Sequence, residues 1–463
     1  MTNKPALVED AAPEIVERAM DRAAGSRPIP GNRLTLLFDG PEVYPAMLER
    51  IASARRWIHF DNYIIRSDAT GRRFADALIE RAQAGVAVRL LTDWVGSMST
   101  RRKYWQRLRE AGVSVRIFNP PKLLRLRQNL TRDHRKLLVV DGATAITGGL
   151  CIGDEWAGRT ARNRQPWRDT AVAVDGPAAA AMDRAFDGVW RLTGDGLDEA
   201  EMLSDAPEQG ESAVRVVAGE PGEVRASRAT ELLLAGAAER IWLTDAYLVA
   251  PPGIYQSLID AAKSGVDVRL LVPGTSDLSH VQSWTRMGYL DMLRAGIKIY
   301  EWRGAMLHAK TIVVDGRWVR VGSSNLNLSS LVANYELDLI AEDPALGLTM
   351  ESQFRRDTER SAEIRLRGPA LAGGRRRRRG AIAPEPVLSS TPHRPSLRER
   401  RGRAVVAMQQ LMRGARRTVL LPYSIALAVV GVLFIFFPNT MAAIFAVLSL
   451  WLALTAWLDG QVP

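Results

Sequence analysis

The chain has 463 residues, of which 47% are hydrophobic and 24% are charged, so it is long enough for two globular domains with additional segments. Its formal net charge of +11 comes from one stretch, residues 375–417, where thirteen arginines are accompanied by only two glutamates (13 − 2 = 11). The remainder is formally neutral, which argues against a nucleic-acid partner, and the single cysteine excludes an internal disulfide bond.

The first half of the chain alternates predicted strands and helices. Residues 1–33 form a polar segment with a short predicted helix and a loop rich in proline and glycine. Beyond them the pattern predicts strands at 34–38, 57–65, 86–92 and 113–118, and helices at 45–54, 71–84 and 100–111. Strands separated by helices of this length predict an α/β sheet with helices packed on it.

The second half repeats this order. The predicted strands are 240–249, 266–272 and 297–302, and the predicted helices are 253–263 and 283–295. The run Gly85–Leu91 closely parallels Gly265–Leu271. Two α/β units can resemble one another by chance, but chance does not explain the repeated motif described next. We therefore predict an internal duplication of two α/β domains. Their bounds are 34–195 and 213–368, joined by a linker at 196–212.

One histidine motif occurs at corresponding places in both repeats. It consists of His134, Lys136 and Asp141 in the first repeat and His308, Lys310 and Asp315 in the second. On a strand, positions two apart face the same side. An imidazole is a competent nucleophile or proton donor, and a lysine supplies positive charge to phosphate oxygens. We predict that these six catalytic residues form one active site for phosphodiester chemistry, with one histidine attacking phosphorus and the other protonating the leaving oxygen. No metal and no cofactor is expected.

Further polar and small residues follow each motif. Gly149, Ser323 and Asn325 are predicted to lie against the phosphate, because small residues permit close backbone approach and an amide donates hydrogen bonds. Two later carboxylates, Asp169 and Glu336, are predicted to orient the histidines and fix their tautomers, although each has the alternative interpretation of an ordinary surface carboxylate. The other histidines lack such neighbours and are predicted to be structural or on the surface: His59, His280 and His393.

The first repeat also carries an insert before its histidine. Residues 120–127 mix leucine with basic residues, which suits contact with anionic lipid headgroups. A solvated loop whose leucines pack back on the domain accounts for the same composition equally well.

The C-terminal region differs in composition from the repeats. Residues 369–417 are rich in Gly, Pro, Ser and Arg and are predicted to be a flexible linker. Residues 418–458 contain no charged side chain, and Pro438 and Asn439 divide them into two stretches of membrane-spanning length. We predict a transmembrane helical hairpin rather than a buried helix pair. The arginines before it place the catalytic domains in the cytoplasm.

These motifs resemble the phospholipase D superfamily, whose signature His-x-Lys-x4-Asp usually occurs twice in a chain. Within residues 34–368, the stretches 129–136, 147–156 and 321–326 are similar to those of bacterial cardiolipin synthases. The resemblance implies two α/β sandwich domains packed face to face, acting on phospholipids at the bacterial inner membrane. It also implies a histidine that attacks one phosphatidylglycerol and releases glycerol. A second phosphatidylglycerol then captures the phosphatidyl-histidine. It further implies that His134 is the nucleophile, that His308 is the acid and base, and that Lys136, Lys310 and Asn325 contact phosphate.

Two features depart from that family pattern. Cys151 occupies the position that matches Asn325, where the superfamily commonly has Asn, and the predicted hairpin is C-terminal rather than N-terminal. Three alternatives remain open at this point. They are a hydrolytic phospholipase D or a transferase using another alcohol, a nuclease on the same fold supported only by the arginine tail, and a non-catalytic membrane scaffold. The oligomeric state is not predicted.

Overall fold

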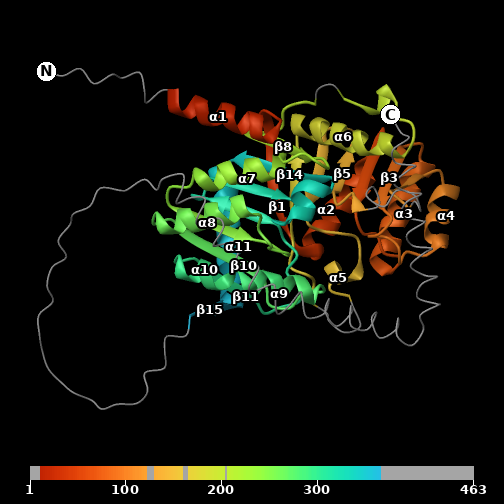
Figure 1. The fold of residues 1–463 in the computed structure, drawn as a ribbon. Coiled ribbons are helices and arrows are strands. Elements are labelled where there is room, and N and C mark those ends of the chain that lie inside the picture. Colours follow the sequence, from red (N-terminus) through yellow and green to blue (C-terminus); the bar gives the residue numbers. More distant parts are fainter. Residues whose placement is uncertain (1–10, 122–129, 160–164, 204–205, 367–463) are drawn as a thin grey trace, which may run out of the picture. The chain divides into compact units, whose positions relative to one another are not determined.

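A computed structural model describes residues 11–366 except 122–129, 160–164 and 204–205 (Figure 1). The chain up to Leu366 forms one compact unit. Most of the leucine- and arginine-containing insert, the arginine-rich linker and the predicted hairpin at 418–458 lie outside the described residues. Within the described ranges, no helix combines the length and the apolar character needed to cross a membrane.

The first repeat follows helix α1 (Ala11–Ala24) and occupies the red to yellow part of the ribbon in Figure 1. Its strands are β1 (Ile29–Phe38), β2 (Trp57–Asn62), β3 (Ala87–Asp93), β4 (Ser114–Phe118), β5 (Lys136–Val140), β6 (Thr144–Gly148) and β7 (Thr170–Asp175). Its helices are α2 (Asp39–Ser53), α3 (Ala69–Gln83), α4 (Arg102–Glu110), α5 (Asp154–Ala157) and α6 (Pro177–Trp190), followed by the short turns η2 (Arg191–Thr193) and η3 (Glu199–Glu201).

The second repeat has the same element order. Its strands are β8 (Ser212–Gly219), β9 (Arg240–Thr244), β10 (Asp267–Pro273), β11 (Lys298–Trp302), β12 (Thr311–Val314), β13 (Trp318–Gly322), β14 (Glu336–Glu342) and β15 (Ser361–Ile364). Its helices are α7 (Arg225–Ala235), α8 (Pro252–Lys263), α9 (Ser279–Met287), α10 (Tyr289–Arg294), the π-helical turn η4 (Ser329–Ala333) and α11 (Pro344–Glu359).

The strand order confirms the α/β class and displays the duplication. From the centre outward the first repeat reads β1-β7-β6-β5-β2-β3-β4, and the second reads β8-β14-β13-β12-β9-β10-β11 with β15 added at the edge. Strands β2, β3 and β4 run parallel to one another, as do β9, β10 and β11. The other neighbouring strands of the sheet, β15 included, pair antiparallel. The antiparallel pair β1 and β8 joins the halves, so the fifteen strands of the described residues form one mixed sheet rather than two separate sandwiches.

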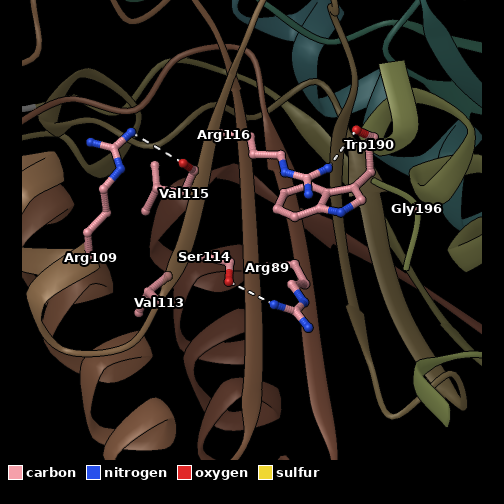
Figure 2. A pocket seen from close by; sticks show the side chains of 8 residues that line it. All are labelled: Arg89, Arg109, Val113, Ser114, Val115, Arg116, Trp190 and Gly196. Atoms are coloured by element: carbon pink, nitrogen blue, oxygen red, sulfur yellow. Dashed lines mark hydrogen bonds between the residues drawn. The ribbon is translucent and has the colours of Figure 1, made fainter. Parts of the chain in front are cut away.

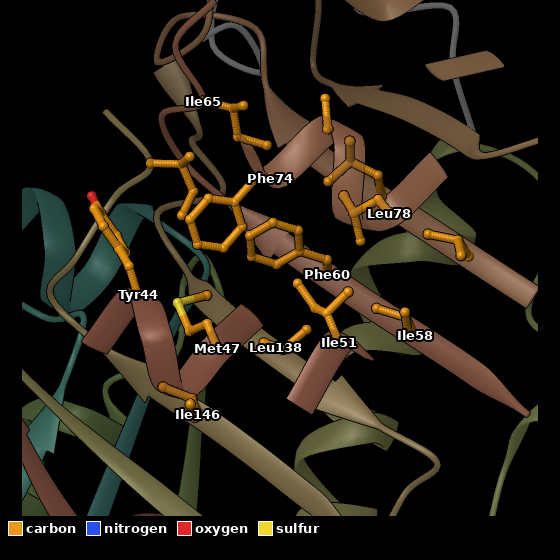
Figure 3. Close-up of a cluster of buried hydrophobic side chains, with 14 of the residues drawn as sticks. Tyr44, Met47, Ile51, Ile58, Phe60, Ile65, Phe74, Leu78, Leu138 and Ile146 are labelled. Carbon is orange, nitrogen blue, oxygen red and sulfur yellow. The ribbon is translucent and has the colours of Figure 1, made fainter. Parts of the chain in front are cut away.

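The two repeats also share a hydrophobic core. Strand β6 contacts β13 and β14, and one buried cluster contains Leu137 and Phe186 of the first repeat together with Val313 and Phe354 of the second. Each repeat has a further core of its own. In the first, aromatic and aliphatic side chains of α2, α3 and β2 meet between helices and sheet (Figure 3). Burial of such side chains stabilises the fold by about 1.5–3 kcal/mol each.

Glycine explains why the two repeats turn from helix to strand in the same way. Helices α3 and α8 are followed by Gly85 and Gly265, and α4 and α10 by Gly112 and Gly296. All four glycines have φ between 87° and 97°, a conformation that a side chain disfavours. The matched Gly-Val and Gly-Ile sequences therefore encode the same turn four times.

Several predicted element bounds differ from the structure. The first strand begins at Ile29 rather than at residue 34, because its first residues pair with β8. The predicted strand 240–249 ends at Thr244. The predicted helix 283–295 is two helices, α9 and α10, that meet at Gly288. These ends depend on tertiary pairing and on a single glycine, which periodicity alone does not resolve.

Candidate active site

A cavity of about 790 Å³ lies between the two repeats at the carboxyl ends of β2, β3, β9 and β10. It is lined by both motif histidines, His134 and His308, by aromatic and aliphatic side chains from each half, and by amide side chains of the second repeat. Carboxyl ends of parallel strands are the usual place for ligands in α/β sheets. The predicted union of the two motifs in one site is therefore present in the geometry.

The backbone of each repeat positions the histidine of the other. The amide of His134 donates to the carbonyl of Tyr335 at 2.9 Å, and the amide of His308 donates to the carbonyl of Arg168 at 2.7 Å. Short parallel bridges join Asp133 to Tyr335 and Arg168 to Leu307. Because Tyr335 and Arg168 each directly precede a buried carboxylate, this pairing places each histidine beside the carboxylate of the opposite repeat.

Glu336 is the partner of His134. Its carboxylate oxygens lie 2.9 and 3.1 Å from Nδ1, and the hydroxyl of Ser323 donates to the same carboxylate. Glu336 is fully buried. With Nδ1–H donating to Glu336, the other ring nitrogen, Nε2, is the one available to the cavity. This is the arrangement that a nucleophilic imidazole requires.

Asp169 is the corresponding partner of His308. Its Oδ2 lies 2.8 Å from Nδ1 of His308 and accepts the indole N–H of Trp156 at 3.1 Å. Its Oδ1 accepts the amide of Thr170 at 2.8 Å. The two carboxylates predicted to orient the histidines are thus buried and hydrogen-bonded to them, each across the boundary between repeats.

The protonation states of the first pair follow from burial and charge. Burial lowers the pKa of His134 to about 4, although Glu336 opposes this, and Lys136 lowers it further. Burial alone raises the pKa of Glu336, but His134 and Lys136 outweigh it and lower the pKa. A neutral imidazole beside an ionised carboxylate is consistent with both directions.

In the second pair, both the histidine and the lysine have lowered pKa values. Burial and Lys310 lower the pKa of His308, while Asp169 opposes them. Burial lowers the pKa of Lys310 to about 8, and nearby Lys136 lowers it further. Each lysine Nζ donates to the carbonyl of its own motif histidine, and Lys310 Nζ also lies 3.1 Å from Nδ1 of His308.

Asp141 and Asp315, the last residues of the two motifs, are not brought into this cavity. Each follows the far end of its motif strand at a positive φ, 53° and 51°. Asp141 accepts three backbone amides, from Arg55, Arg56 and Trp57, at 2.8–2.9 Å. Asp315 accepts three equivalent amides at 2.8 Å. These hydrogen bonds hold the turn before β2 or β9 against the motif strand, which is a structural role. The positions of the two aspartates give no support for a catalytic role.

Gly149 and Ser323, both predicted to contact phosphate, instead stand beside the orienting carboxylates. A Cβ at Gly149 would lie 2.1 Å from Oδ1 of Asp169, so only glycine leaves room for that carboxylate. Ser323 is at the matching position, fifteen residues after its histidine, and donates to Glu336. The orienting carboxylate is therefore accommodated differently in the two repeats. Gly149 leaves space for Asp169, whereas Ser323 donates a hydrogen bond to Glu336.

Asn325 does line the cavity, and so does its counterpart Cys151. Both are buried, at 4% and 0% exposure. The amide nitrogen of Asn325 lies 3.4 Å from the hydroxyl of Ser330, whereas its Oδ1 is buried without a partner. A thiol is a weak donor. Of these two matched residues, only Asn325 of the second repeat is therefore a strong hydrogen-bond donor.

The aromatic surroundings of the histidines were not predicted from the sequence. Trp156, Trp167 and Tyr247 lie with ring centroids 5.6, 5.8 and 5.9 Å from His308. His134 has one such neighbour, Tyr63, at 4.8 Å. Each tyrosine follows the first strand of its parallel set, a recurrence that was visible in the sequence. The tryptophans carried no comparable signal.

Asn334 is a further lining residue that the pattern did not indicate. It lies two residues before Glu336, as Trp167 lies two residues before Asp169. Its side chain is mostly buried, and its Oδ1 has no hydrogen-bond partner. One wall of the cavity is therefore aromatic where the matching wall carries an amide.

Two other features of interest prove to be structural. His59 is buried, with Nδ1 2.5 Å from Asp183 and Nε2 3.2 Å from Glu201, which confirms its predicted structural role. A second cavity of about 320 Å³ at the β4 edge is lined by Arg89, Arg109 and Arg116 (Figure 2). These three arginines are held by internal acceptors: Arg89 by Glu201, Arg109 by the Val115 carbonyl, and Arg116 by the carbonyls of Trp190 and Asp195.

Comparison with known proteins agrees with this geometry. Residues 47–190 and 232–358 match the family described as "Cardiolipin synthase, PLD-like domain". The chain is 34% identical over 348 residues to a cardiolipin synthase of Alkalihalophilus pseudofirmus, covering 73% of this chain and 69% of that protein. It is 35% identical over 321 residues to one of Geobacillus thermodenitrificans, covering 68% of this chain and 64% of that protein. The fold is similar to the crystal structure of a phosphatidylserine synthase of Haemophilus influenzae (TM-score 0.58, 14% identity, 75% of this chain and 92% of that one).

Proposed function

The chain belongs to the cardiolipin synthase, phospholipase D-like family, and from this membership we propose that it condenses two phosphatidylglycerol molecules into cardiolipin and glycerol. The observation that carries the proposal is the pair of histidines in one cavity, each bonded to a buried carboxylate of the opposite repeat. Two such groups suit a double displacement, in which one attacks while the other moves a proton.

In the first step, Nε2 of His134 attacks the phosphorus of one phosphatidylglycerol. His308 enters this step as the imidazolium, the charged form that Asp169 favours. The bond from phosphorus to the glycerol headgroup oxygen breaks, His308 gives that oxygen its proton, and glycerol leaves. The products are free glycerol and a phosphatidyl group linked to His134 by a phosphorus–nitrogen bond. Glu336 holds His134 in the tautomer that leaves Nε2 unprotonated.

In the second step, a headgroup hydroxyl of another phosphatidylglycerol attacks the same phosphorus. His308 accepts the hydroxyl proton, the phosphorus–nitrogen bond breaks, and cardiolipin leaves with His134 neutral again. Lys136, Lys310 and Asn325 stabilise the charge on the non-bridging oxygens during both steps. The aromatic wall around His308 limits access of water, which favours transfer to an alcohol over hydrolysis.

The proposed setting is the bacterial cytoplasmic membrane, with the two repeats on the cytoplasmic side. It is supported by the relatives' printed function and by the predicted hairpin at 418–458, which lies outside the described residues. The arginine-rich linker before the hairpin suits anionic lipid.

The full chain, purified in detergent and mixed with phosphatidylglycerol and a chelator, tests the proposal. We expect cardiolipin and glycerol in equal amounts, resolved by mass spectrometry. His134→Ala and His308→Ala should lose the activity, while His393→Ala, outside the described residues, serves as the matched control. Phosphatidic acid as the only lipid product would identify a hydrolytic phospholipase D instead, and turnover that survives loss of both histidines would support a scaffold.

A further inference from the structure

The mouth of the active-site cavity has an exposed apolar rim. Among the described residues, the large hydrophobic side chains that both line the cavity and are exposed to solvent come from both repeats: Val95, Met98, Val249, Leu278, Trp284 and Leu328. Met98 is 67% exposed and Leu328 is 62% exposed. Scattered exposed apolar residues are ordinary, but a set gathered around one opening marks a binding surface. We name these six residues the rim.

Part of the rim is built from corresponding loops of the two repeats. Val95 and Met98 follow strand β3, and Leu278 follows its counterpart β10. Helix α9, which continues from Leu278, carries exposed Met287 just beyond the rim. The apolar side chains thus surround the passage to the histidines from opposite sides. A partner that covers the rim also faces the cavity. That partner must therefore allow the substrate to reach the histidines.

Positive charge lies directly beside the rim. Arg101, Arg102 and Lys103 follow Met98 at the start of α4, and all three are exposed. No ion pair of these three side chains is found among the described residues. The cavity lining itself contains one carboxylate in the described part of the chain, Asp277, which accepts the hydroxyl of Tyr247 at 2.8 Å. Apolar side chains flanked by cations match the surface of an anionic lipid bilayer.

The size of the cavity points to the same partner. A space of about 790 Å³ suits a drug-sized molecule, so it takes a lipid headgroup and its phosphate rather than a whole diacyl lipid. Removing acyl chains from a bilayer into water is unfavourable for every methylene exposed. A protein that leaves those chains in the bilayer must bring the mouth of the cavity to its surface.

From these observations we propose that the rim is a membrane-docking surface, which inserts Met98 and Leu328 into the headgroup region of an anionic bilayer while Arg101, Arg102 and Lys103 contact its phosphates. The proposal rests on the proposed function, because it assigns the phospholipid's point of entry. It concerns contact made by the folded repeats, separate from any anchoring by residues 418–458.

Depth-dependent quenching on the full chain tests this surface. Met98→Cys and Leu328→Cys are each labelled with an environment-sensitive fluorophore, and the native Cys151 is not labelled because it is fully buried. Val16→Cys and Leu348→Cys are matched controls, exposed by 59% and 61% on helices α1 and α11 and absent from the cavity lining. The proteins are reconstituted in phosphatidylglycerol-containing vesicles that carry doxyl-labelled lipid.

We expect the lipid quencher to act on labels at 98 and 328 and to leave those at 16 and 348 unaffected. Replacing the three cations (R101Q/R102Q/K103Q) should reduce quenching at 98 to the level found on neutral phosphatidylcholine vesicles. Equal quenching at all four positions, or none at 98 and 328, would overturn the proposal. So would labels at 98 and 328 that resist both the lipid quencher and iodide in water, because a protein segment would then cover the rim.

Product analysis of the unlabelled wild-type chain in vesicles of the same lipids separates this inference from the proposed function. Cardiolipin formation with labels at 98 and 328 fully open to iodide would refute docking alone. Lipid quenching at both positions without cardiolipin or glycerol would leave docking in place and refute the proposed function.

Discussion

The two halves of the active site use the same backbone and different side chains. Both histidines receive a carboxylate from the opposite repeat, and both lysines donate to their own histidine's carbonyl. Yet His308 stands among three aromatic rings and His134 beside one. Duplication supplied a symmetric frame, and divergence of a few lining residues made the half-sites unequal. In the proposed reaction one half-site supplies the nucleophile and the other supplies the acid and base, so the unequal surroundings give each role its own environment.

The largest expected effect comes from asking which histidine becomes covalently modified. With phosphatidylglycerol, both His134→Ala and His308→Ala should lose activity by at least about 10³-fold. A phosphatidic acid ester of p-nitrophenol needs no protonation of its leaving group. On this ester His308→Ala should still release nitrophenolate in a stoichiometric burst and accumulate phosphatidyl-His134, detected by mass spectrometry. A burst from His134→Ala instead would reverse the assignment.

The orienting carboxylates should come next. Glu336→Gln and Asp169→Asn keep the shape but remove the charge that fixes each tautomer, so each should lower kcat by about 10²–10⁴-fold. On the nitrophenyl ester, Glu336→Gln should slow the burst, whereas Asp169→Asn should slow only the turnover that follows it. Identical effects of the two variants on the burst would show that the half-sites are equivalent.

The pH dependence distinguishes the two motifs by charge. His134, with a pKa of about 4, must be neutral to attack, so activity should fall as pH drops through about 4. Lys310, with a pKa of about 8, must be charged to hold phosphate, so activity should fall as pH rises through about 8. Since arginine stays charged, Lys310→Arg should remove the alkaline decline. A rate profile from pH 3.5 to 10 measures both limits, and an alkaline decline unchanged in Lys310→Arg would contradict this assignment.

A smaller effect is expected from the Cys151 and Asn325 pair. Replacing Asn325 with Cys removes a hydrogen bond to charged phosphate oxygen, typically about 1.5–3 kcal/mol, so kcat/KM should fall by about 10–100-fold. Cys151→Ala removes only a weak donor and should change kcat/KM by less than about threefold. Steady-state kinetics on phosphatidylglycerol compare them. Equal losses would mean that both positions contact phosphate in the same way.

The smallest effect on turnover should come from the motif aspartates. Asp141→Asn weakens acceptance of three backbone amides and should destabilise the protein by about 1–3 kcal/mol, with kcat per folded molecule unchanged. Thermal unfolding and active-enzyme titration separate the two quantities. Asp315→Asn is the counterpart in the second repeat and should behave alike. A loss of kcat with unchanged melting temperature would restore a catalytic role.

Some features of the fold and of the site were predictable from the sequence, and others were not. The repeated order of elements and the glycines after four helices follow local rules, so the α/β class and the duplication were readable from periodicity. The sharing of one mixed sheet was not, because β1 and β8 pair across the repeats. Gly149 and Ser323 were assigned to phosphate on their small size and their position after each motif, and only the fold shows that they stand against Asp169 and Glu336.

By itself, the sequence indicated the proposed chemistry of this protein, because two copies of a His-Lys pair at fixed spacing predict a nucleophile, a proton donor and two cations in one site. Tertiary structure decided how they meet. It crossed the carboxylates between repeats, since Asp133 pairs with Tyr335 and Arg168 with Leu307. It also sent the motif aspartates to the far ends of their strands, because a strand separates its two ends by about 3.3 Å per residue. Spacing along the chain does not show which of these residues touch one another. The contacts follow from the folded sheet.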